Sequence, residues 1–380
     1  MSPLLDESVL ESPQGIAAAD PGGMLRAVAS AGAQVRQATR LATEAGVAQV
    51  AAEGRPRAVV LIGMGGSGIA AEITAAVAGT RCPVPVLSHH APWLPGWVGP
   101  TDLVIAVSCS GATEEVLLAA REAARRGCRL VTVGAPGSTL AATAEQARGI
   151  HLPVDPGGRL PRANVWALSV PPLLVLDALG LAAVPGDALD AAADRLDRLA
   201  ATLGPASPPS QNPAKALALE LAEDLPAVWG SGDVAEASAY RLACQLNENA
   251  KLPVTYGALP EIAHNQIVSL DGPFAGTSTE DDFFRDRVDE PGAGARLRIL
   301  LLRDTAEHPH VTAQRKALVE IALERGTQVH EILAQGEHPL ERLGHLVLTG
   351  DFLSVYVALL RGTDPTPIGP ITQMKGRLAR

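Results

Sequence analysis

A glycine-rich turn, GMGGSG at residues 63–68, follows the apolar run of residues 58–62 and precedes a stretch with helical periodicity. Glycine lets the backbone turn tightly and approach a ligand closely, and the free N–H groups of a first helical turn attract negative charge. A buried strand, a glycine turn and a helix in this order are typical of anion-binding loops in α/β proteins. We therefore predict an α/β fold with a phosphate-binding loop here; the alternative is a tight turn without a ligand.

The spacing GxGxxG, which begins at Gly63, also matches the first half of a dinucleotide-binding fingerprint. The second half requires an acidic residue about 20 positions further on, at the end of the second strand, to bind the ribose hydroxyls. The expected second strand, residues 84–87, ends in the sequence SHH, which contains no carboxylate. The loop is therefore interpreted as a site for a single phosphate group, and we expect no cofactor.

Composition narrows the class of protein. At 380 residues with 47% apolar content, the chain is long enough for two domains with real cores. A net charge of −10 without basic runs argues against a nucleic-acid or membrane partner. The first residues, MSPLLDESVLESPQ, are acidic and lack the apolar core of a secretory signal. Four cysteines without a CxxC pair favour reduced thiols, so we expect a cytoplasmic protein without a metal site.

Apolar strand-like runs alternate with helical patterns in both halves, which predicts parallel sheets covered on both faces. The expected strands are residues 58–62, 84–87, 103–108, 130–133, 151–154, 227–232, 298–302, 328–332 and 346–348. Residues 165–184 are apolar but contain two prolines and an aspartate, so we expect a buried helical region there. A strand and glycine turn recur at residues 227–232, which suggests duplication of one fold.

These patterns predict four segments: an N-terminal helical segment at 1–55, a first domain at 56–203, a proline-rich linker at 204–214 and a second domain at 215–380. Residues 272–295, rich in Gly, Asp and Thr, are expected to form a long excursion.

A second loop, SCSGATEE at residues 108–115, follows the expected third strand. Its hydroxyls, on Ser108, Ser110 and Thr113, cluster at the entrance to a helix, where hydroxyl donors and backbone amides suit phosphate oxygens. Helix capping alone would explain the same residues. However, this loop and the glycine turn both lie at the carboxyl ends of strands, where open α/β sheets place their ligands.

Together, strand-GMGGSG-helix and strand-SxSGxTEE-helix resemble the sugar isomerase (SIS) domain superfamily. The resemblance implies two tandem SIS domains, each a parallel sheet flanked by helices in a flavodoxin- or Rossmann-like arrangement. It also implies that the substrate's phosphate is bound by Gly65, Gly66, Ser67, Ser108, Ser110 and Thr113. This chain has Ala112 where many relatives carry asparagine.

The second half carries NENAK at residues 247–251 and PEIAHN at residues 260–265. A charged cluster within apolar sequence is costly unless it is solvated, paired or functional, and taken singly Glu248 could be a solvent-facing helix residue and His264 a core histidine. The two motifs in this order resemble the bifunctional phosphoglucose/phosphomannose isomerase family, and the resemblance extends over the whole chain. Lys251 and Glu261 are expected to serve local structure.

The resemblance implies specific roles for residues of this chain. Glu248 would be the catalytic base, His264 of the neighbouring subunit would assist ring opening, and Lys375 would contact the sugar. Arg162 would be the active-site arginine, with Arg159 as the competing choice. One carboxylate can remove and return the proton, and a histidine can pass a proton between ring oxygen and hydroxyl.

The implied reaction is aldose–ketose isomerisation of glucose 6-phosphate, and of mannose 6-phosphate, to fructose 6-phosphate through a cis-enediol(ate), without metal or cofactor, in a homodimer. Relatives commonly show the sequence NHNE in the histidine motif, where this chain has Ala263 at the first position and Gln266 at the last. Two alternatives therefore stay open: a non-catalytic SIS protein that binds sugar phosphate, and an SIS isomerase of a different sugar phosphate.

Overall fold

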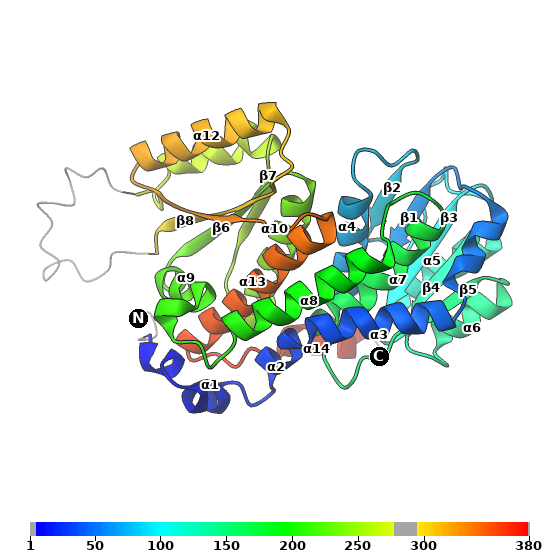
Figure 1. The fold of residues 1–380 in the computed structure, drawn as a ribbon, viewed down its shortest axis with the longest axis horizontal. Helices are drawn as coiled ribbons and strands as arrows, with labels where there is room; N and C mark the ends of the chain where they lie inside the picture. The colour runs from blue at the N-terminus through cyan, green and yellow to red at the C-terminus, as the bar shows by residue number, and fades with distance from the viewer. Residues whose placement is uncertain (1–4, 277–294, 379–380) are drawn as a thin grey trace, which may run out of the picture. The chain divides into compact units, whose positions relative to one another are not determined.

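The computed structural model describes residues 5–276 and 295–378 (Figure 1), so most of the excursion expected at residues 272–295 lies outside the described residues. The chain divides into two compact units. Unit 1 comprises Met1–Ala29, Leu199–Gln335 and His345–Arg380, and unit 2 comprises Ser30–Arg198 and Gly336–Gly344. Each unit contains its own parallel sheet.

The sheet of unit 2 is entirely parallel, and its strand order is β2-β1-β3-β4-β5, which is the flavodoxin-like order. Its strands are β1 (Val59–Ile62), β2 (Val86–His89), β3 (Leu103–Ser108), β4 (Arg129–Gly134) and β5 (Ile150–Pro153). Its helices are α3 (Ala31–Glu44), α4 (Gly66–Ala78), α5 (Glu114–Arg125), α6 (Thr139–Gln146) and α7 (Val165–Ala178), with short 3-10 turns at η2 (Val47–Glu53) and η3 (Pro161–Ala163).

Alternate residues of β1 and β3 fill two separate cores. Val59 and Leu61 pack in the cluster that includes residues of α4 and α7, whereas Val60 and Ile62 pack with residues of α5. Because successive strand residues point to opposite faces, a sheet covered on both faces needs apolar residues at every position. This explains the continuous apolar runs and confirms the α/β class expected from the sequence.

The sheet of unit 1 is also parallel, with order β7-β6-β8-β9. This order repeats that of the first four strands of the other sheet, β2-β1-β3-β4, in agreement with a duplicated fold. The strands are β6 (Leu225–Ser231), β7 (Thr255–Ala258), β8 (Leu297–Arg303) and β9 (Gln328–Leu333).

The helices of unit 1 are α1 (Pro13–Ala19), α2 (Met24–Ala29), α9 (Pro213–Leu221), α10 (Asp233–Ala250), α12 (Pro309–Glu324) and α14 (Gly369–Leu378), with 3-10 turns at η1 (Glu7–Leu10), η4 (Pro209–Gln211), η5 (Glu261–His264) and η6 (Gln266–Asp271). Helices α8 (Gly186–Leu203) and α13 (Pro339–Leu360) each contain a boundary between the two units.

One expected strand is wrong and one strand was missed. Residues 346–348 lie inside α13, because three consecutive apolar residues look alike in a buried strand and in a buried helix. The edge strand β7 is short and half-exposed, so it lacks a continuous apolar run. Helix α13 is long and apolar enough to cross a membrane, but 94% of its most apolar window is buried within the protein, as in a core helix.

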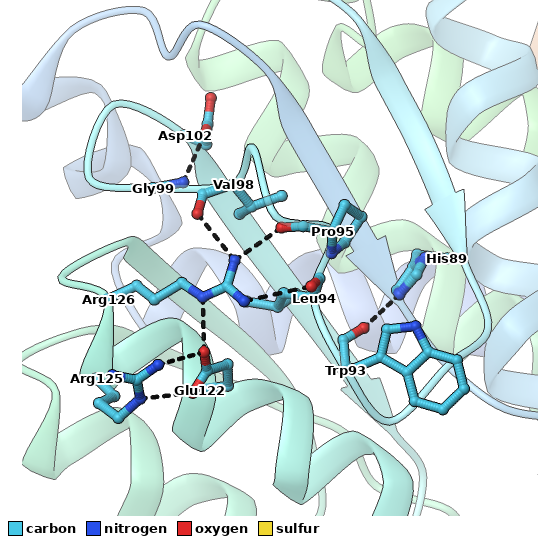
Figure 2. A network of polar contacts seen from close by, with 10 residues as sticks. All are labelled: His89, Trp93, Leu94, Pro95, Val98, Gly99, Asp102, Glu122, Arg125 and Arg126. Atoms are coloured by element: carbon cyan, nitrogen blue, oxygen red, sulfur yellow. Dashed lines mark hydrogen bonds and ion pairs between the residues drawn. The ribbon is translucent and has the colours of Figure 1, made fainter.

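The chain between β2 and β3 is held in part by Arg126, which directly follows α5 (Figure 2). The guanidinium of Arg126 donates to the carbonyl oxygens of Pro95 (2.7 Å), Val98 (3.1 Å) and Leu94 (3.3 Å). Its Nε donates to Glu122 at 2.7 Å. These hydrogen bonds hold residues 94–98, which form neither helix nor strand, in one conformation.

A buried ion pair fastens α10 to α13 within unit 1. Arg241 donates two hydrogen bonds of 2.9 Å to the carboxylate of Asp351, which also accepts one from Gln245. One helical turn after Gln245, the amide of Asn249 donates to the hydroxyl of Ser354 at 2.9 Å. These buried contacts hold the last turns of α10, the segment that carries Glu248.

Candidate active site

The glycine turn lies at the carboxyl end of β1 and leads directly into α4, as the sequence predicts. Gly65 is the N-cap residue with a φ of 55°, in the region that favours glycine. A Cβ on Gly63 would lie 2.4 Å from the carbonyl oxygen of Ser67, so this position also requires glycine. The turn can therefore bring backbone N–H groups of the first turn of α4 close to an anion.

The hydroxyl loop follows β3 at the same edge of the sheet, and a buried hydrogen bond joins it to the glycine turn. The hydroxyl of Ser67, which is 5% exposed, accepts from the backbone N–H of Cys109 at 3.2 Å. The hydroxyls of Ser108 and Thr113 lie 2.8 Å apart, and the exposed Ser110 hydroxyl accepts from the N–H two residues later. Unit 2 thus brings all six expected phosphate-binding residues to one edge.

Thr113 does not cap its own helix through its side chain. The N-cap residue of α4 is Gly65, which has no side chain, and the hydroxyl of Thr113, the N-cap residue of α5, contacts Ser108. By contrast, Ser138 caps α6 through its hydroxyl in the ordinary way. The N-termini of α4 and α5 therefore have backbone N–H groups that a ligand anion can bind.

The two arginines proposed for the site differ in their surroundings. Arg162 is 2% exposed, and a Cβ on Gly66 would lie 2.9 Å from its backbone nitrogen, so η3 packs directly on the start of α4. Arg159 is half-exposed; its Nε donates to the Asn164 side chain at 2.8 Å, and its Nη2 to the carbonyl of Asp155. Arg162 is the arginine that lies against the glycine turn.

Glu248 lies in the last turn of α10, half-buried between an exposed Asn247 and a buried Asn249. The residue that ends this helix, Lys251, adopts a left-handed conformation with a φ of 56°. Its ammonium donates to the Glu248 carbonyl at 2.7 Å and to the Asp364 carbonyl at 3.3 Å. Lys251 therefore connects the end of α10 to the segment that precedes α14, which agrees with the local role expected for it.

His264 ends η5 and is exposed, and the residues around it form a hydrogen-bonded turn. The Asn265 amide donates to Glu261 at 2.8 Å. Gln266 accepts from the Trp229 indole at 2.9 Å and donates to the Tyr256 carbonyl at 2.9 Å. Gln266, one of the residues that depart from the pattern of the resembling family, thus makes two hydrogen bonds that fix the turn after His264.

Lys375 lies in the last turn of α14 and is exposed. Glu248, His264 and Lys375 thus belong to separate elements of unit 1, and their joint action on one substrate stays a prediction. Within the described residues, no three His, Cys, Asp or Glu side chains lie close enough together to hold a metal ion.

Comparison with known proteins identifies the family. A model of the bacterial phosphoglucose isomerase C-terminal SIS domain matches residues 210–378. The bifunctional phosphoglucose/phosphomannose isomerase of Caldicellulosiruptor bescii is 30% identical over 321 residues, which cover 84% of this chain and 89% of that protein. The chain belongs to the bifunctional phosphoglucose/phosphomannose isomerase family. A family member from Thermoplasma acidophilum is 27% identical over 323 residues, with the same 84% of this chain and 89% of that protein covered.

Solved structures confirm the SIS fold. A putative phosphosugar isomerase from Silicibacter pomeroyi superposes with a TM-score of 0.65 at 18% identity, covering 90% of this chain and 99% of that chain. The C-terminal domain of glucosamine-fructose-6-phosphate aminotransferase from Francisella tularensis gives a TM-score of 0.64 at 12% identity, covering 90% of this chain and 97% of that chain. At these identities the likeness establishes the fold alone.

Proposed function

We propose that this protein is an aldose–ketose isomerase that interconverts glucose 6-phosphate and mannose 6-phosphate with fructose 6-phosphate. The observation that carries the proposal is the presence, in a member of this family, of both the paired phosphate loops and the set Glu248, His264 and Lys375. A protein that only bound sugar phosphate would need the loops but would have no use for this set.

The phosphate end of the substrate would bind where α4 and α5 begin. The backbone amides of Gly65, Gly66 and Ser67, together with the hydroxyls of Ser108, Ser110 and Thr113, offer hydrogen bonds to three phosphate oxygens. The Ser67–Cys109 hydrogen bond supports this role because it holds the two loops in register before a ligand arrives. Binding energy at the phosphate then positions the reacting carbons.

At the carbon end, His264 would transfer a proton from the C1 hydroxyl to the ring oxygen, which opens the ring. Glu248 would remove the proton from C2 and return it to C1, and the intermediate between these steps is a cis-enediol(ate). Glucose and mannose 6-phosphates differ only at C2, so both give the same intermediate. Arg162 and Lys375 would stabilise negative charge on its oxygens, an electrostatic task for which fixed cations are sufficient.

The deciding experiment follows fructose 6-phosphate in deuterated water by NMR, with the wild type, Glu248→Gln and the matched control Glu261→Gln. The wild type and the Glu261 variant should produce glucose and mannose 6-phosphates carrying deuterium at C2, and the Glu248 variant should not. A chelator should leave the rate unchanged. Binding of fructose 6-phosphate without turnover would overturn the isomerase and favour a sugar-phosphate-binding protein, and turnover of another sugar phosphate alone would assign a different isomerase.

The homodimer with a shared site is tested by mixing two inactive variants, Glu248→Gln and His264→Asn. If His264 acts from the neighbouring subunit, a mixed dimer contains one site with both wild-type residues, and activity returns on mixing. If each subunit supplies both residues to its own site, mixing restores no activity.

We also propose a cytoplasmic location for this enzyme. Its four cysteines, Cys82, Cys109, Cys128 and Cys244, are free thiols, which supports a reducing compartment.

A further inference from the structure

His90 directly follows β2 and contacts both the glycine turn and the helix that leaves it. Its Nδ1 lies 2.9 Å from the carbonyl oxygen of Gly63, and its Nε2 lies 2.9 Å from Oε1 of Glu72 on α4. The Ser88 hydroxyl lies 3.0 Å from the same Nε2. A Cβ on Gly68 would lie 3.0 Å from the imidazole ring, so the ring packs against the first turn of α4.

The two partners of the ring determine its charge. A carbonyl oxygen and an ionised carboxylate can only accept hydrogen bonds, whereas a neutral imidazole has one N–H group to donate. Both contacts are satisfied together when both ring nitrogens carry protons. Consistent with this, the hydrogen bond with Glu72 raises the pKa of His90, and the hydrogen bond from His90, followed by that from Ser88, lowers the pKa of Glu72.

A neighbouring titratable group is His89, whose ring contacts the Trp93 carbonyl (Figure 2). Its hydrogen bond leads into the crossover segment after β2 and involves no atom of the glycine turn. The charge on His90 is therefore controlled by Glu72 on α4.

Holding the Gly63 carbonyl has a consequence for the phosphate loop. In a trans peptide the C=O and the following N–H point in opposite directions, so a carbonyl fixed toward His90 fixes the N–H of Met64 away from it. A glycine turn is otherwise free to rotate its peptide planes. His90 thus restrains the loop at its first residue, while Glu72 anchors the ring to α4.

We propose that His90, as an imidazolium held by Glu72, is a positioning residue that preorganises the Gly63–Gly68 turn for a phosphate monoester. The inference deepens the proposed function, on which the identity of that monoester rests. In the sequence, His90 was notable only because it stands where a dinucleotide-binding protein would carry an acidic residue. The proposal gives this histidine a role in holding the glycine turn.

Two isosteric variants separate the contacts of the ring. In His90→Asn the amide nitrogen stands near the position of Nδ1 and can still donate to the Gly63 carbonyl, whereas in His90→Gln it reaches the position of Nε2 and loses that carbonyl. Both remove the same charge. His89→Asn is the control for a neighbouring histidine that makes its own carbonyl contact.

The readouts are calorimetric binding of inorganic phosphate and the KM and kcat for fructose 6-phosphate. We expect His90→Gln to weaken phosphate binding and raise KM roughly tenfold with kcat nearly unchanged, as befits one lost hydrogen bond to a charged group. His90→Asn should show a smaller loss, and His89→Asn none. In the wild type, phosphate affinity should fall as the pH rises through the pKa of His90, and this step should be absent from Glu72→Gln.

Equal phosphate affinity in His90→Gln and wild type would overturn the inference, as would equal losses in all three histidine variants. If His90→Gln does not fold, the pH step in the wild type and its absence in Glu72→Gln decide the question. The binding of inorganic phosphate can be measured without turnover. If the wild type binds phosphate but converts no hexose phosphate, the proposed function is refuted, while the phosphate affinities of the His90 variants still test the positioning role.

Discussion

The hydroxyl of Ser67 accepts a hydrogen bond from the backbone N–H of Cys109, across 42 residues of sequence. This contact joins the glycine turn to the hydroxyl loop. Ser67→Ala would leave a buried N–H without its acceptor, which costs about 1–3 kcal/mol of stability, and would weaken phosphate binding in parallel. Urea unfolding and phosphate calorimetry measure the two effects. Ser12→Ala, which removes a hydroxyl that caps α1 in unit 1, is the matched control: it should lose stability but keep phosphate affinity.

Arg162 and Arg159 are separated by one experiment on activity. Because Arg162 lies against the glycine turn, Arg162→Lys should lower kcat about 100-fold, the cost typical of losing one donor to a developing negative charge. Arg159→Lys should leave kcat within about threefold, since that guanidinium contacts Asn164 and a backbone carbonyl. The reverse order of effects would transfer the catalytic role to Arg159.

Lys251 links the end of α10 to residues 364–365 through its ammonium. Lys251→Met keeps the chain length but removes the donors, so we expect about 1–3 kcal/mol of lost stability and roughly tenfold lower kcat because Glu248 is held less firmly. Lys316→Met, at an exposed position of α12, should change neither quantity. Loss of stability with unchanged kcat would confine Lys251 to a structural role.

The Glu72–His90 pair predicts a bounded pH range of stabilisation. The raised pKa of His90 means that its contribution is complete below its ordinary value of 6.5 and is lost as the pH rises through the raised value. The lowered pKa of Glu72 means that its contribution is present above 4.5 and is lost as the pH falls through the lowered value. The stability difference between wild type and Glu72→Gln should therefore be largest from about pH 5 to 6. A difference that grows from pH 6 to pH 9 would contradict the pairing.

Arg125 and Arg126 both donate hydrogen bonds to the carboxylate of Glu122. These bonds, that of Arg125 having the larger effect, lower the pKa of Glu122 to about 2. Only Arg126 also binds the carbonyls of the segment after β2 (Figure 2). Arg126→Lys should therefore lower the free energy of unfolding by about 1–3 kcal/mol, whereas Arg125→Lys, at an exposed position, should lower it much less. Equal effects in urea titrations would show that the carbonyl contacts contribute nothing.

Much of the fold could be predicted because the relevant signals are local. The apolar runs at β1 and β3 mark strands buried on both faces, and the glycine at position 65 marks a backbone conformation that other residues avoid. The prediction of a strand at residues 346–348 was wrong because a short apolar run occurs in buried strands and in buried helices alike. The length of α13 is what identifies this run as helical.

From the amino-acid sequence we predict the two phosphate loops, because glycines and hydroxyls stand between an expected strand and an expected helix, and we predict Glu248 as the base from the resemblance of its motif to a known family. The residues that contact the two loops follow from the three-dimensional fold. Ser67 and Cys109, or Gly63 and His90, are far apart in sequence, and parallel strands bring them to one edge of the sheet. Hydrogen bonds between such distant residues depend on the order of the strands and on the packing of α4. Local patterns in the amino-acid sequence do not specify either of these.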